Sequence, residues 1–193
     1  AVRLHGGKGV LDALPEKAVD LRPLGPADLC YIQFSSGSTR HPHGVQIMQR
    51  ALMANLAGMT GPAGLDVVPG DRTASWLPLY HDMGLIGAWL GSLYYAAPAF
   101  IMPPLTFLAD PSRWLWAIHR HRATLSAAPN FAFELCLKSV RDQDIEGLDL
   151  STLRMVVNGA EPVSPSTIRR FTERFVRYGF RPEAMAPVYG LAE

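Results

Sequence analysis

The sequence has little cysteine and no excess of charge of either sign. Its two cysteines, Cys30 and Cys136, are too few for a disulfide framework, and the absence of a CxxC pair removes the usual zinc and dithiol motifs. Eighteen Lys and Arg residues stand against 17 Asp and Glu residues, so the net charge is only +1. We therefore expect a cytoplasmic protein with reduced thiols and no electrostatic affinity for nucleic acid or for an acidic membrane.

Charge is missing altogether from the 27 residues between Met83 and Ala109. A stretch of that length is long enough to span a bilayer. It is interrupted by glycines and prolines, and Pro98 divides it in the middle. These interruptions predict a helix followed by a buried strand inside a folded core, and no membrane span.

What the sequence does have is apolar residues and turn-forming residues. Hydrophobic residues make up 48% of the 193 residues, which excludes a disordered tail. Glycine (17 residues) and proline (16 residues) are both frequent, and they predict many tight connections between elements. The length suits one large domain or part of a larger enzyme.

Short apolar runs alternate with amphipathic stretches along the chain. The predicted strands are Cys30–Phe34, Val45–Met48, Thr73–Leu77, Ala99–Met102, Thr124–Ala127 and Leu153–Val157. The predicted helices are Arg50–Met59, Met83–Ala96, Ser112–His121, Phe131–Val140 and Pro165–Tyr178. Strands separated by helices predict an α/β fold with layered, mostly parallel sheets, in which ligands bind beyond the carboxyl ends of the strands.

A hydroxyl-rich loop follows the first predicted strand. Its candidate phosphate-binding residues are Ser35, Ser36, Gly37, Ser38, Thr39 and Arg40. Hydroxyls and free backbone N–H groups donate to phosphate oxygens, and an arginine adds a fixed positive fork. The loop is neither a Walker loop nor a nucleophile elbow. From composition alone, an ordinary polar turn between two strands remains an equal alternative.

The loop Ser35–Gly44 resembles the signature [ST]-S-G-[ST]-T-G-x-P-K-G of the adenylate-forming ligases. This family includes acyl-CoA synthetases, peptide-synthetase adenylation domains and fatty acyl-AMP ligases. Arg40 replaces the usual glycine and His43 the usual lysine, a pattern that is most similar to the fatty acyl-AMP ligases. In this resemblance Arg40 supplies the charge that the missing lysine would carry.

Two further segments resemble the part of the family that binds the acyl group. The first is the aromatic–His–x–x–Gly element from Trp76 to Leu85, and the second is the Pro-Asn-Phe segment at 129–131. The resemblance implies an acyl pocket formed by Trp76, Tyr80, His81, Pro129, Asn130 and Phe131, with His81 catalytic. A structural histidine and a core-packing helix are the alternatives. An amino-acid substrate would need a buried carboxylate, for which Asp82, Asp110 and Glu134 remain open.

Two later segments resemble the family's nucleotide-binding loops. The resemblance implies that adenine is bound by Asn158, Gly159, Ala160, Glu161, Tyr189 and Gly190. It also implies that Glu193, at the end of the motif Tyr189-Gly-Leu-Ala-Glu, holds Mg²⁺ together with Thr39, and that Glu193 is catalytic. A carboxylate oxygen is a ligand that Mg²⁺ prefers.

Other residue groups have weaker interpretations. The pairs His41/His43 and His119/His121 have no nearby third metal ligand, so we expect ordinary histidines there. A hydrolytic triad built on Ser36 and His81 would need a nucleophile elbow, which is missing. Arginines between 169 and 177 are expected to form the solvated face of a helix, with a docking patch for an acidic carrier protein as the alternative.

The resemblance implies an enzyme that uses ATP and Mg²⁺ to convert a fatty acid into an acyl-adenylate, with release of pyrophosphate. The acyl group would then pass to an acyl carrier protein, in lipid or polyketide biosynthesis. An acyl-CoA synthetase, an amino-acid adenylation domain and a nucleotide-binding module without turnover remain alternatives. We expect residues 1–27 to be a connecting segment and residues 28–193 to be part of an adenylation domain that is inactive alone.

Overall fold

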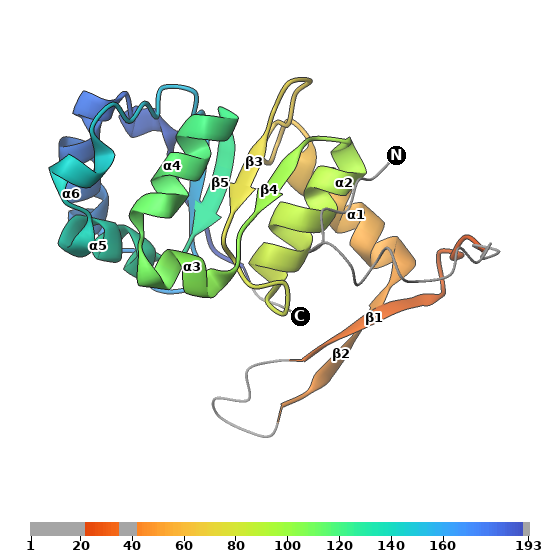
Figure 1. Cartoon of the computed structure of the whole chain (residues 1–193). Helices are drawn as coiled ribbons and strands as arrows, with labels where there is room; N and C mark the ends of the chain where they lie inside the picture. Colours follow the sequence, from red (N-terminus) through yellow and green to blue (C-terminus); the bar gives the residue numbers. More distant parts are fainter. Residues whose placement is uncertain (1–21, 35–41, 191–193) are drawn as a thin grey trace, which may run out of the picture.

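The computed structural model describes residues 22–34 and 42–190 (Figure 1). The strands in this part of the chain are β1 (Leu29–Phe34), β2 (Gly44–Met48), β3 (Thr73–Ser75), β4 (Ala99–Ile101), β5 (Leu125–Ala128), β6 (Met155–Asn158) and β7 (Met185–Pro187). The α-helices are α1 (Gln49–Thr60), α2 (Gly91–Tyr95), α3 (Pro104–Ala109), α4 (Ser112–His121), α5 (Asn130–Ser139) and α6 (Pro165–Phe175). A π-helix, η1 (Met83–Leu90), and the short 3₁₀ turns η2 (Asp142–Ile145), η3 (Val176–Tyr178) and η4 (Pro182–Ala184) complete them.

Five strands form a parallel sheet in the order β4-β3-β5-β6-β7. Figure 1 shows α4, α5 and α6 on one side of this sheet and α1 and α2 on the other. The predicted α/β fold with helices around a mostly parallel sheet is therefore confirmed. Because all five strands run the same way, their carboxyl ends meet at one edge.

The first two strands do not join that sheet. β1 and β2 pair antiparallel as a separate two-stranded sheet, with Phe34 opposite Gly44. The expected mostly parallel arrangement therefore does not extend to the strand before the hydroxyl-rich loop, since β1 and β2, which this loop connects in the sequence, form a hairpin. No helix separates these strands in the sequence, so the short connection imposes the antiparallel arrangement.

The charge-free stretch is divided among four elements. The predicted helix Met83–Ala96 starts as η1 and continues as α2, which ends where Ala96 adopts a left-handed conformation. β4 and α3 then complete the stretch. Among the residues described, no helix is long and apolar enough to cross a membrane.

The two faces of the parallel sheet are packed differently. Ala74, Ala128 and Val156 point to the side of α4 to α6, where they join a core of aromatic residues. Trp114, for example, is fully buried there and donates from Nε1 to Ser126 Oγ at 2.9 Å. Because side chains alternate along a strand, the neighbouring residues face α1 and η1 instead.

An ion pair holds the connection between α1 and β3. Arg154 Nη2 contacts Asp71 Oδ2 at 2.5 Å, and Arg154 also donates to the backbone oxygens of Leu65 and Asp66. Burial alone would raise the pKa of the Asp71 carboxyl, but the hydrogen bonds from Arg154 and Thr124 lower it below its usual value. The connection is thus fastened to the amino-terminal ends of β5 and β6.

Candidate active site

Four of the predicted site segments lie at the carboxyl edge of the parallel sheet. Residues 76–82 follow β3, residues 129–131 follow β5, residues 158–161 end β6 and follow it, and residues 188–190 follow β7. Segments that are up to 114 positions apart in the sequence (76 to 190) are therefore gathered by the sheet topology. This is the edge at which open α/β sheets bind their ligands.

Contacts between these segments join them into one surface. The rings of Trp76 and Phe131 meet edge to face, with centroids 6.0 Å apart. The backbone N–H of Phe131 donates to Glu161 Oε1 at 2.5 Å, and the backbone N–H of Val188 donates to the backbone oxygen of Asn158 at 2.9 Å. The acyl-type and adenine-type segments predicted from the sequence are thus direct neighbours.

His81 lies in a turn that its neighbour Asp82 stabilises. His81 Nδ1 and Asp82 Oδ1 are 2.7 Å apart, and Asp82 Oδ1 also accepts the backbone N–H of Met83 at the start of η1. The hydrogen bond to Asp82 raises the pKa of the His81 imidazole above its usual value, although burial opposes this effect. Because Nδ1 faces Asp82 Oδ1 and lies 3.2 Å from the backbone nitrogen of Met83, Nε2 is the nitrogen left to meet a substrate.

The hairpin contacts this turn directly. The side chain of Gln33, near the end of β1, donates from Nε2 to the backbone oxygen of Tyr80 at 3.4 Å. The ring of Tyr80 itself is 84% exposed. Gln33 belongs to β1, so this contact joins β1 to the His81 turn. Ser35, Ser36, Gly37, Ser38, Thr39, Arg40 and Glu193 lie outside the described residues.

The predicted adenine-binding residues divide into buried and exposed groups. Asn158 is fully buried, and within the described structure its Oδ1 has no hydrogen-bond partner. A Cβ atom on Gly159 would stand 2.6 Å from Cγ2 of Val188, so only glycine allows this approach. Ala160 has a φ of 68°, in the left-handed region, and Tyr189 is 90% exposed. Small residues and an exposed ring leave room for a planar ligand.

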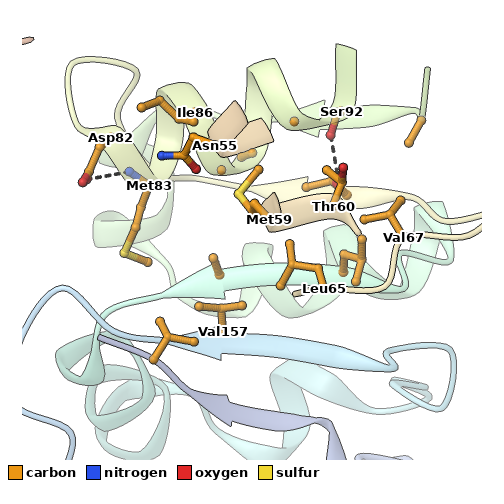
Figure 2. A pocket seen from close by; sticks show the side chains of 18 of the residues that line it. Asn55, Met59, Thr60, Leu65, Val67, Asp82, Met83, Ile86, Ser92 and Val157 are labelled. Atoms are coloured by element: carbon orange, nitrogen blue, oxygen red, sulfur yellow. Dashed lines mark hydrogen bonds between the residues drawn. The ribbon is translucent and has the colours of Figure 1, made fainter. Parts of the chain in front are cut away.

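An apolar cavity of about 460 Å³ lies on the other face of the sheet, between the strands and the α1, η1 and α2 layer (Figure 2). Its lining includes Ile47, Leu52, Met59, Leu65, Val67, Met83, Ile86, Ala88, Leu125, Ala127, Val157 and Val188. Asp82 also lines it, so the cavity begins beside the His81 turn. A volume in this range suits a small-molecule ligand.

The cavity does not use the residues predicted for an acyl pocket. Trp76, Tyr80, His81, Pro129, Asn130 and Phe131 are not among its lining residues. Trp76 is buried and stacks on Phe107 with centroids 4.0 Å apart, on the side of the packed core. The six residues lie after β3 and β5, at the carboxyl edge of the sheet. Their contact with an acyl group stays a prediction. The sequence signal for the cavity itself was the charge-free stretch after His81.

The carboxylates considered for an amino-acid substrate are differently placed. Glu134 accepts a hydrogen bond from Thr167 and pairs with Arg170. Asp110 accepts from the hydroxyl and the backbone N–H of Ser112 at the start of α4. Of these three carboxylates, Asp82 alone lines the cavity, and it is already paired with His81.

Arg174 on α6 is less solvated than the sequence suggests, whereas Arg169, Arg170 and Arg177 are exposed as expected. Arg174 is largely buried and donates to the backbone oxygens of Cys136, Leu137 and Val140 at the end of α5. It also contacts Asp142, which pairs in turn with Arg177. The expected solvated face is therefore wrong for Arg174, because the end of α5 carries carbonyls that need donors.

An α/β sheet with loops gathered at its carboxyl edge and an apolar cavity beside them is the arrangement in which proteins of this fold class bind small molecules. Residues 6–193 match the AMP-binding enzyme family, and the chain belongs to that family. The family prediction from the sequence is confirmed.

Two individual relatives are named as ligases that form fatty acyl-adenylates, the branch that the sequence resembles. The chain is 43% identical to the long-chain-fatty-acid–AMP ligase FadD26 of Mycobacterium marinum over 93% of its own length and 31% of that protein. It is similar to the crystal structure of a fatty acyl-adenylate ligase from L. pneumophila in complex with acyl adenylate and pyrophosphate. The TM-score is 0.85 at 41% identity, covering 89% of this chain and 30% of that one. The chain thus spans about a third of the length of the curated relative that it matches.

Proposed function

We propose that this chain forms the acyl-binding and part of the nucleotide-binding region of an enzyme that activates a fatty acid as its acyl-adenylate. The observation that carries the proposal is the apolar cavity of about 460 Å³ that begins beside the His81 turn. An alkyl chain gains free energy from apolar burial roughly in proportion to the buried area. The cavity therefore suits the chain of a fatty acid whose carboxylate lies near His81.

In the proposed reaction a carboxylate oxygen attacks the α-phosphorus of ATP. A new oxygen–phosphorus bond forms, the bond to the bridging oxygen of the β-phosphate breaks, and pyrophosphate leaves with the electron pair. The imidazolium of His81, favoured by Asp82, would stabilise negative charge near the carboxylate. Holding both reactants in line would supply much of the remaining rate enhancement.

The phosphate and metal parts of the proposal lie in residues that the structure does not describe. Ser35 to Arg40 would hold the phosphates, and Thr39 and Glu193 would hold Mg²⁺, which neutralises phosphate charge when bound. Support comes from the contact of Gln33 with Tyr80, which joins β1, the strand that precedes these residues in the sequence, to the His81 turn. Gly159, Ala160 and Tyr189 would accommodate the adenine.

The proposal continues with transfer of the acyl group to an acyl carrier protein in the cytoplasm. The alternatives are transfer to coenzyme A, activation of an amino acid, and nucleotide binding without turnover. Against the amino acid stands the lining of the cavity: of the described residues that form it, only Asp82 has a carboxylate, and this carboxylate is paired with His81. An ammonium group would have no free partner there.

Pyrophosphate exchange tests the proposal in the complete enzyme that includes this chain. We expect exchange of labelled pyrophosphate into ATP with fatty acids and none with amino acids. ATP binding without any exchange would instead support the nucleotide-binding module. Single-turnover transfer from the acyl-adenylate to carrier protein or to coenzyme A then identifies the acceptor.

Gly87→Leu tests whether the cavity holds the chain. Gly87 lines the cavity, and an added Cβ would meet nothing within 4 Å, so a larger side chain can enter the space. We expect the longest accepted acyl chain to become shorter in exchange assays, because the volume is occupied. The matched control is Gly58→Leu, at an exposed helical glycine whose added Cβ also meets nothing. Equal chain-length profiles for the two variants would contradict this use of the cavity.

A further inference from the structure

The cavity is not apolar throughout, because hydroxyl side chains of five residues line it: Tyr31, Thr60, Thr73, Ser92 and Ser126. Ser126 Oγ donates to the backbone oxygen of Ala74. Thr60, Thr73 and Ser92 form what we call the hydroxyl cluster, and all three residues are at least nine-tenths buried. Ser92 Oγ donates to Thr73 Oγ1 at 3.1 Å, and Thr60 Oγ1 donates to the backbone oxygen of Leu56 at 2.8 Å. These bonds offset the cost of burying hydroxyls in an otherwise apolar wall.

The hydroxyl cluster lies at the end of the cavity remote from the His81 turn. Thr73 begins β3, whereas the His81 turn follows the other end of that strand. Ser92 comes ten residues after Asp82 along η1 and α2, which corresponds to about 15 Å of helical rise. Figure 2 shows Asp82 and Met83 at one end of the cavity and Ser92 and Thr60 at the other. An acid with its carboxylate beside His81 would point the far end of its chain at this cluster.

The pair formed by Ser92 and Thr73 has hydrogen-bonding capacity to spare. Each hydroxyl has one proton and two acceptor lone pairs. The proton of Ser92 goes to Thr73, and among the described residues no acceptor is recorded for the proton of Thr73. A guest group can therefore accept from Thr73 and donate to Ser92 at the same time, a combination that a hydroxyl supplies and an ester or ketone does not.

Charged groups are excluded at that end. Among the described residues, no lysine or arginine lines the cavity, so a second carboxylate would be buried without a partner from them. Asp82 is the one charged residue of this described lining; it is at the other end of the cavity and is paired with His81, so a terminal ammonium group would be unpaired too. A neutral hydroxyl remains as the polar group that fits.

We propose that the hydroxyl cluster selects fatty acids that carry a hydroxyl group at the end opposite the carboxylate. This inference rests on the proposed fatty acid activation and names its substrate class. A purely structural role for Ser92, in which it only fastens α2 to β3, makes a different prediction. Its loss would then affect all acids alike, whereas a binding role affects the hydroxylated acid selectively.

The experiment measures kcat/KM for pyrophosphate exchange in the complete enzyme with two acids of equal chain length, one ω-hydroxylated and one unsubstituted. We expect the wild-type enzyme to prefer the ω-hydroxy acid about tenfold, which is what one well-formed neutral hydrogen bond contributes. Ser92→Ala and Thr73→Val should each reduce that ratio to about one. Ser139→Ala, at an exposed helical serine away from the cavity, should leave the ratio unchanged.

The possible results distinguish a failure of this inference from a failure of the proposed fatty acid activation. Exchange with both acids at equal efficiency in the wild type overturns the inference and leaves the fatty acid activation standing. A preference that Ser92→Ala and Thr73→Val leave intact overturns it as well. No exchange with either acid, or with any fatty acid, overturns the proposed function and this inference with it.

Discussion

At the scale of single residues, the two glycines of η1 have opposite surroundings. A Cβ on Gly84 would stand 2.2 Å from the backbone oxygen of Pro78, whereas a Cβ on Gly87 would meet nothing within 4 Å. The same Pro78 oxygen accepts the backbone N–H of His81. Gly84 is therefore the residue that lets η1 approach the turn carrying His81.

Gly84→Ala is expected to destabilise the protein by about 1–3 kcal/mol, the usual cost of forcing an extra methyl group into a packed site. Gly87→Ala should be neutral or stabilising by up to about 1 kcal/mol, because alanine restricts the unfolded chain and favours helix. Urea denaturation of both variants measures the difference. Equal free energies of unfolding for the two alanine variants would contradict the close approach.

A second prediction at this scale concerns the protonation of His81. The hydrogen bond to the Asp82 carboxylate is the main cause of its raised pKa, so Asp82→Asn should lower the pKa of His81, and burial should then bring it below the usual value. Titration of the His81 imidazole by NMR measures the change.

The sign of the pH effect on stability follows from the same pair. The raised pKa of His81 means that the pair stabilises the folded state fully below about pH 6.5 and loses this contribution as the pH rises through the folded pKa. The pKa of Asp82 is lowered in the folded state, so the stability that its ionised carboxylate contributes is lost as the pH falls through that lowered pKa. An unchanged titration of His81 in Asp82→Asn would show that Asp82 does not control this histidine.

At the scale of elements, α5 depends on an arginine from another helix. Arg174 on α6 donates to the backbone oxygens of Cys136, Leu137 and Val140 at the carboxyl end of α5, where the last carbonyls of a helix lack partners within it. We expect Arg174→Ala to cost about 1–3 kcal/mol, because these carbonyls lose a charged donor in a part-buried place. Arg169→Ala is the matched control, since Arg169 is exposed and has no recorded hydrogen bond within the described structure. Thermal unfolding of both variants provides the comparison, and equal losses would contradict the capping role.

Sequence patterns predicted the elements whose signals are local. Ser164 accepts from the backbone N–H of Thr167 and Pro165 opens α6, as their types and positions indicate. The short α3 and the three-residue β7 were missed, because their residues satisfy no periodicity and depend on neighbours in the sheet. The π-helical form of η1 was missed too, since the glycines that permit it carry no periodic signal of their own.

The candidate site was predictable to a similar extent. Loops at the carboxyl edge could be located from the sequence, because strand ends and turn residues are adjacent in the chain. The charge-free stretch after His81 was a signal for one wall of the cavity. The cavity as a whole could not be located from the sequence, since Leu65, Ile86 and Val157 come from three separate segments that only tertiary packing brings together. Burial of Asn158 was equally hidden, because asparagine is a common loop residue and its neighbours do not reveal the side that it faces.

At the scale of the whole molecule, the structure divides into a parallel-sheet body and a hairpin. β5 and β6 lie inside the five-stranded sheet, with helices on both sides (Figure 1). In contrast, β1 and β2 pair only with each other, and the apolar side chains of Ile32 and Phe34 are 48% and 64% exposed. Little apolar burial stabilises the hairpin, although it leads into the loop proposed to hold the phosphates.

Hydrogen exchange should therefore distinguish the two parts in the 193-residue chain. Amides of β5 and β6 are expected to exchange only through global unfolding, while those of β1 and β2 exchange through a local opening that needs less free energy. Because few apolar contacts are lost in that opening, its rate should also depend less on urea. Mass spectrometry of peptides covering residues 29–34 and 155–158 measures both quantities. Equal protection and equal urea dependence of the two peptides would mean that hairpin and body unfold as one cooperative unit.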